Sequence, residues 1–158
     1  MKFVATKEAL SDKLSLCSAI AEKRQTIPIL SNVLIKAEKQ HITVVATDLE
    51  RQLSLKINDC EVLEEGETTV SARKLFELIR SVSDDTKLNF KVRENQLEIT
   101  ALSFQADLAI LPVQDFPFVD IDTHNFNLSL YGSAFGKILE STSFAMASAD
   151  VRYYLNGL

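Results

Sequence analysis

The sequence predicts an α+β fold in which a β-α-β-β-β unit occurs twice, with two helices packed on antiparallel sheets. Three observations predict it. Short segments alternate apolar and polar residues, as half-buried strands do. Two longer segments repeat apolar residues at helical spacing. The two kinds of segment follow one another as strand, helix and three strands, and then in the same order again.

The first half begins with a strand predicted at residues 2–6 and a helix predicted at residues 7–22. One face of this helix carries the apolar residues Leu10, Leu14, Cys17 and Ala21. Pro28 indicates a loop over residues 25–30, because its ring fixes the backbone and removes an amide donor. Alternating apolar residues then predict three strands, at residues 33–38, 42–47 and 52–58.

The second half repeats this order, with a strand predicted at residues 68–71 and a helix at residues 72–83. The apolar stripe of this helix consists of Leu75, Phe76, Ile79 and Val82. Three further strands are predicted at residues 87–92, 96–101 and 103–111.

The two halves also match residue by residue. A shift of 55 positions places Val33 on Leu88, Ile42 on Leu97 and Leu53 on Leu108. A shift of 65 positions superposes the two helices. Any two sets of amphipathic strands align at some offset, but ten consistent matches without a gap favour a true internal repeat.

The repeat and the turn residues define the expected domains. Residues 1–112 form a first domain, and residues 113–125 form a linker that mixes prolines and aspartates with aromatic residues. A shift of 125 positions then brings back the opening pattern, which predicts strands at 126–130 and 153–158 around a helix at 132–147. We therefore expect residues 126–158 to be the incomplete start of a second domain.

Composition and charge narrow the class of protein. The 158 residues are 46% hydrophobic and 25% charged, which disfavours disorder. The sequence shows no signal peptide and only two cysteines, so we expect a cytoplasmic protein with no membrane association. Seventeen basic and twenty-two acidic residues give a net charge of −5, which disfavours a polycation that coats DNA but allows a local basic face.

No catalytic constellation is found, and the sequence predicts no metal and no cofactor. His41 is expected as a solvated residue of a turn, with no second ligand at metal-binding spacing. Cys17 lies on an apolar helix face, which favours a buried structural thiol over a nucleophile. The segment GSAFGKI at residues 132–138 is one residue too short for a phosphate-binding loop.

Basic residues are the remaining candidates for a function. Lys23 and Arg24 end the first helix, where cations also favour the helix dipole. Arg73 and Arg80 lie opposite the apolar stripe of the second helix. Such residues suit either contacts with a phosphate backbone or a solvated surface of mixed charge, and the spacing alone leaves both interpretations open.

Several motifs carry a resemblance to a known family. They are MKF at residues 1–3, TIPILSN at 26–32, ATDLE at 46–50, VSARKLF at 70–76, DFP at 115–117 and DVRYYLNG at 150–157. With them the chain resembles the bacterial DNA sliding clamps, the beta subunits of DNA polymerase III. The resemblance implies the DNA-clamp fold, with three similar domains per chain and two chains in a ring around duplex DNA. It also implies a non-catalytic role as processivity factor, with DNA polymerase III and clamp-loader subunits as partners.

The resemblance assigns roles to particular residues. It implies that Arg24, Arg73, Tyr153 and Tyr154 contact DNA, with Lys23 and Arg80 beside them. It implies that Arg152, Tyr154 and Leu155 border a pocket for short peptides of polymerases and clamp loaders. Lys74 and Leu108 fall near the edge where the full-length homodimer closes.

A chain of 158 residues is too short for three such domains, so it is expected to be a truncated clamp that cannot close the ring. The alternative is a stand-alone protein-interaction module that uses an exposed sheet edge. Salt-dependent DNA binding is expected only of the first.

Overall fold

The computed structural model describes residues 1–21, 27–102, 104–118, 128–147 and 150–157. The chain divides into two compact units, Met1–Asp120 and Ile121–Leu158. Lys23 and Arg24, two of the predicted DNA contacts, lie outside the described residues.

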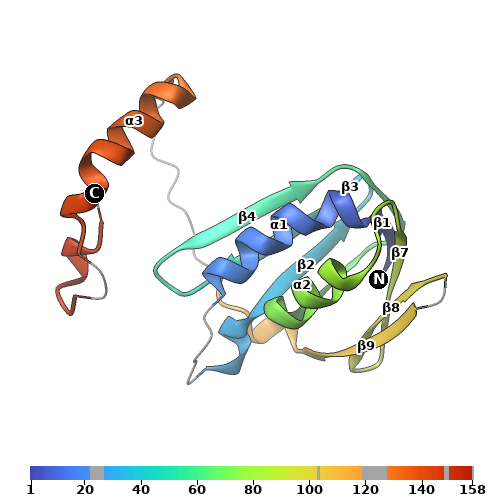
Figure 1. Ribbon diagram of the computed structural model, residues 1–158. Helices are drawn as coiled ribbons and strands as arrows, with labels where there is room; N and C mark the ends of the chain where they lie inside the picture. The colour runs from blue at the N-terminus through green and yellow to red at the C-terminus, as the bar shows by residue number, and fades with distance from the viewer. Residues whose placement is uncertain (22–26, 103, 119–127, 148–149, 158) are drawn as a thin grey trace. The chain divides into compact units, whose positions relative to one another are not determined.

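The first unit has the predicted α+β composition. Its first half consists of β1 (Lys2–Thr6), α1 (Lys7–Ile20), β2 (Asn32–Glu38), β3 (His41–Thr47), β4 (Gln52–Ile57) and β5 (Cys60–Glu64). Its second half consists of β6 (Gly66–Ser71), α2 (Ala72–Ser81), β7 (Lys87–Arg93), β8 (Gln96–Ala101) and β9 (Phe104–Leu111). All strand pairs are antiparallel, in the order β4-β3-β2-β6-β9-β8-β7-β1-β5. Helices α1 and α2 pack side by side against this sheet (Figure 1).

The pairing of the strands confirms the doubled unit. The first strand of each half pairs with the second strand of the other half, β1 with β7 and β6 with β2. In these ladders Phe3 lies opposite Phe90, and Thr68 lies opposite Ile35. Phe3 and Thr68 are 65 residues apart and Ile35 and Phe90 are 55 apart, which are the two shifts of the sequence repeat. The halves are therefore interlocked, since each one completes the sheet of the other.

The prediction missed β5. Cys60 and Val62 are half-buried while Glu61, Leu63 and Glu64 are exposed, so the strand alternates over only five residues. With two glutamates among its five residues, it resembles a solvated connection. β5 pairs with β1, the first strand of the first half. In the second half, the end of β9 pairs in the same way with the first strand, β6, through Ile110 and Leu111.

The main core lies between the two helices and the sheet. It includes Leu10 and Leu14 of α1 and Leu75 and Ile79 of α2, as predicted from the helical spacing. Cys17 is buried in the same core, as expected, and burial raises the pKa of its thiol to about 11. Across the β1–β7 ladder, the rings of Phe3 and Phe90 stack with centroids 4.5 Å apart.

Two predicted loop features are wrong in detail. Residues Pro28–Ser31 form a 3-10 helix (η1), because proline at its first position already has a helical φ. Ile29 and Leu30 of this turn are buried with Phe116 in a second apolar cluster on β2 and β3. His41 begins β3 and is not a free turn residue, since its Nε2 lies 2.6 Å from Oε2 of Glu38 across the hairpin.

In the second unit the predicted helix is shorter than expected. It comprises α3 (Gly132–Thr142), followed by a 3-10 turn at Ser143–Ala145. The strands predicted at 126–130 and 153–158 are wrong where the structure describes these residues. Leu128 to Leu130 are not in a strand, and Tyr153–Leu155 form a 3-10 turn (η4). A strand needs a neighbouring strand for its hydrogen bonds, and the described part of this unit contains none.

The stacked ring pair provides a test of the interlocked halves. Phe90→Ala should lower the free energy of unfolding by about 3–5 kcal/mol, because it removes a buried ring and leaves a cavity between β1 and β7. Leu102→Ala, at a fully exposed position, should change it by less than about 0.5 kcal/mol. Urea unfolding measures both, and equal effects of the two substitutions would contradict the role of this pair.

A polar connection also joins the halves and should make stability depend on pH. Lys7 Nζ donates to Val82 O and Asp84 Oδ1, both at 2.7 Å, and the Asp85 amide donates to Glu8 Oε1 at 2.8 Å. The hydrogen bond and charge of Lys7 lower the pKa of Asp84, and the Asp85 amide does the same for Glu8.

A carboxyl group whose pKa is lowered by folding stabilises the fold above its ordinary pKa, near 4, and loses this contribution as the pH falls through the lowered value. Urea midpoints should therefore fall as the pH is lowered from 5 toward 2. Asp84→Asn and Lys7→Met should each reduce the fall. A pH profile that neither substitution changes would show that this connection contributes nothing to stability.

Candidate nucleic-acid interface

The outward face of α2 carries most of the predicted basic residues of the first unit. The helix begins after Ser71, whose Oγ accepts a hydrogen bond from the Lys74 amide at 3.5 Å. Ala72, Leu75 and Ile79 are buried, which turns the intervening charged residues to solvent. The exposed charged residues are Arg73, Lys74, Glu77 and Arg80. Three cations and one carboxylate give this face a modest positive charge.

Two of these cations have partners on α2 itself. Arg73 Nε donates to Glu77 Oε1 at 2.7 Å, and the two side chains are 69% and 51% exposed. The hydrogen bond, reinforced by charge, raises the pKa of Arg73 and lowers the pKa of Glu77. The Arg80 guanidinium lies 5.9 Å from the centroid of the Phe76 ring. The face is therefore positive, but part of its hydrogen-bonding capacity is already used.

Helix α1 adds little charge beside it. Its described residues include two lysines, Lys7 and Lys13, and two acids, Glu8 and Asp12. Ser15, Leu16 and Ala19 are also exposed. The net positive charge of the two adjacent helices therefore comes from α2.

A separate group of predicted residues lies in the second unit, in a closed turn over residues 150–157. The Asp150 carboxylate accepts hydrogen bonds from the Arg152 amide at 2.8 Å and from its guanidinium at 3.1 Å. The Asn156 side chain accepts from the Asp150 amide at 3.0 Å and donates to the Asp150 carbonyl at 2.9 Å. The arginine contacts lower the pKa of Asp150.

This turn brings three predicted pocket residues together. Arg152 is exposed, Tyr154 is 68% exposed and Leu155 is half-buried. The backbone of Tyr153 lies in η4, but its side chain is outside the described part of the chain. Sequence reasoning did not find Asp150 or Asn156, because their roles depend on closure of the turn rather than on periodicity.

Leu108 lies on a strand that is paired unequally on its two sides. Strand β9 pairs with β8 through residues 104–109, with Leu108 opposite Leu97. On its other side the described strands provide a partner only at Ile110 and Leu111, through β6. Because β6 continues directly into α2, Lys74 belongs to the same region of the fold.

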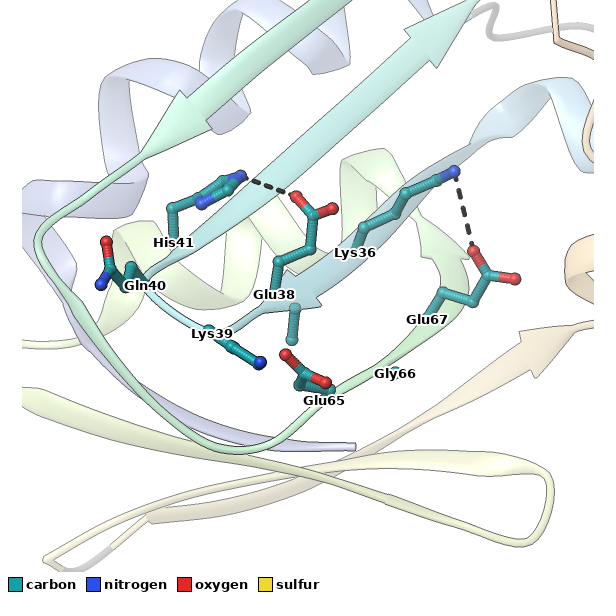
Figure 2. Close-up of a pocket in the computed structure, with 9 residues that line it drawn as sticks. Lys36, Glu38, Lys39, Gln40, His41, Glu65, Gly66 and Glu67 are labelled. Atoms are coloured by element: carbon teal, nitrogen blue, oxygen red, sulfur yellow. Dashed lines mark ion pairs between the residues drawn. The ribbon is translucent and has the colours of Figure 1, made fainter.

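The structure also shows a groove that the sequence did not predict. Its volume is about 660 Å³, and it lies between the β2–β3 hairpin and the connection from β5 to β6 (Figure 2). Lys36 Nζ lies 3.7 Å from Glu67 Oε2, and His41 pairs with Glu38. The charged groups that line the groove thus pair largely with one another. Within the described ranges, no three His, Cys, Asp or Glu side chains form a group that could hold a metal ion.

Comparisons with known proteins cover the whole chain. The family model described as DNA polymerase III beta subunit, N-terminal domain, matches residues 1–120. The beta sliding clamp of Pseudomonas aeruginosa is 40% identical over 158 residues, which are 100% of this chain and 43% of that protein. The beta sliding clamp of Escherichia coli K12 is 31% identical with the same coverage.

Solved structures agree with these matches. The crystal structure of the DNA polymerase III subunit beta from Pseudomonas aeruginosa has a TM-score of 0.92 at 39% identity, covering 99% of this chain and 43% of that one. The sliding clamp of Caulobacter crescentus has a TM-score of 0.94 at 30% identity, covering 100% and 43%. The chain thus spans less than half the length of these relatives. No helix in its described ranges has the length and apolar character that a membrane crossing requires.

The closed turn in the second unit can be tested by amide exchange. Asp150→Ala removes the acceptor of the Arg152 amide and guanidinium, so the amides of Arg152 and Leu155 should exchange several-fold faster. Lys137→Ala, on the exposed surface of α3, should leave these rates unchanged. Hydrogen exchange followed by NMR measures them, and unchanged rates in Asp150→Ala would show that this carboxylate does not hold the turn.

Proposed function

Because this chain belongs to the DNA polymerase III beta subunit family, we propose that it supplies the N-terminal domain of a DNA sliding clamp, a ring that encircles duplex DNA and tethers the replicative polymerase. The observation that carries the proposal is the match over both units of the chain to clamp structures at 30–39% identity. Two adjacent helices with a weakly basic outward face support it.

The electrostatics suit a protein that stays on DNA by topology. A closed ring is retained without tight contacts, and strong phosphate contacts would oppose its movement along the duplex. A net charge of −5 with a positive α2 face provides weak, local attraction. The role is that of a non-catalytic processivity factor in the cytoplasm.

Individual residues take the roles implied by the family resemblance. Arg73 and Arg80 of α2, with Lys23, Arg24, Tyr153 and Tyr154, contact DNA. Arg152, Tyr154 and Leu155 form part of a pocket for peptides of the polymerase and the clamp loader. Lys74 and Leu108 belong to the edge at which two chains meet in a homodimer. Since the chain spans 43% of its relatives' length, ring closure is proposed for a clamp of their size.

One observation favours a second candidate function. Residues 104–109 of β9 have a strand partner on one side only within the described fold. Such an edge can add a strand from another protein, which is the mode of a stand-alone interaction module. In a clamp the same edge serves the contact between chains, so the edge is compatible with both functions. DNA binding distinguishes them, because it is expected only of the clamp.

Titration of the 158-residue chain with a duplex oligonucleotide tests the proposal. Fluorescence anisotropy should show weak binding. The logarithm of the association constant should fall linearly with the logarithm of the salt concentration. Arg73→Ala should weaken binding and reduce the slope by about 0.9, the value for one phosphate contact. Arg93→Ala removes an equal charge from the β7–β8 hairpin and should have little effect. Absence of salt-dependent binding would instead favour the interaction module.

A further inference from the structure

Each of the five arginines that the structure describes has a partner within the chain. Arg51 pairs with Asp48 at 2.6 Å, Arg73 with Glu77 at 2.7 Å, Arg93 with Glu98 at 2.7 Å and Arg152 with Asp150 at 3.1 Å. Arg80 lies over the ring of Phe76. The arginine side chain is the one best suited to bidentate phosphate binding. Because these arginines already have partners within the chain, their contacts with phosphate groups are weaker than they would otherwise be.

Glu77 occupies a special position among these partners. It is the only acidic residue of α2, and it follows Arg73 by four residues and Lys74 by three, while Arg80 follows it by three. Side chains at these spacings are neighbours on a helix surface. The charge of Arg80 also lowers the pKa of Glu77. One carboxylate therefore lies among the three cations of the face proposed to meet DNA.

Helix stability is a weak explanation for this arrangement. Exposed pairs of this kind contribute little to helix stability, and the order in which the acid precedes the base is the more favourable one. Here the base comes first, and both side chains are largely exposed. The position of Glu77 is therefore better explained by its effect on how the α2 face binds a ligand.

We propose that Glu77 is a positioning residue that holds Arg73 and keeps the attraction of α2 for DNA phosphates weak. This inference rests on the proposed clamp function. The carboxylate occupies the Nε–H of Arg73, so a phosphate must displace it or bind the remaining guanidinium donors. Its negative charge also reduces the charge of the α2 face from +3 to +2. The consequence is a clamp surface that follows the DNA backbone without binding it firmly.

Glu77→Gln tests the proposal, because it keeps the shape of the side chain and removes its charge. The variant should bind a duplex oligonucleotide about three- to ten-fold more tightly at low salt, with a steeper salt dependence. Glu98→Gln is the matched control, since it frees Arg93 from a pair of the same length and changes the net charge equally. This control should bind within about two-fold of the parent chain.

A double variant separates an effect through Arg73 from a general effect of charge. In the Arg73→Ala background, Glu77→Gln should increase affinity much less than it does in the parent chain. Equal effects of Glu77→Gln and Glu98→Gln would overturn the proposal, as would an undiminished effect in the Arg73→Ala background. If the parent chain shows no salt-dependent DNA binding, the clamp function fails and this inference fails with it.

Discussion

The exchange of strands between the two halves is the constraint on which the rest of the first unit depends. β1 completes the sheet of the second half through β7, and β6 completes the sheet of the first half through β2. The stacked rings of Phe3 and Phe90 lie in one of these ladders. Because each helix directly follows an exchanged strand, the exchange also places α1 and α2 side by side (Figure 1).

This placement determines the character of the surface proposed to face DNA. The inner faces of both helices are committed to one core, so the charged residues of α2 lie on its outward face. The charge there is small, because α1 balances its own charges and Glu77 offsets part of α2. Weak attraction is what a ring needs if topology, rather than affinity, keeps it on DNA. Arg152 is also paired within the chain, because the Asp150 carboxylate holds it in the turn over residues 150–157.

Much of the first unit could be predicted from the sequence, because its strands and helices are amphipathic and each has one buried face. The partners Phe3 and Phe90 were not predicted, because the repeat aligns the two halves but does not show that they exchange strands. Prediction failed where tertiary contacts decide. The short acidic β5 and the 3-10 turn at Pro28 depend on neighbours distant in sequence, and the strands expected around α3 have no partner strand among the described residues of the second unit. Arg73 and Arg80 could be placed on the solvent face of a helix from their spacing, whereas the contacts of Asp150 and Asn156 needed the closed turn.

The most direct test of DNA binding by the helices is to map where duplex DNA contacts the chain, by following backbone amide shifts in NMR spectra at low salt. The shifts should concentrate on the outward face of α2 and the adjacent surface of α1, and they should disappear as salt is raised. Shifts centred on residues 104–109 of β9, or shifts that persist at high salt, would contradict this prediction and would identify the sheet edge as the functional surface.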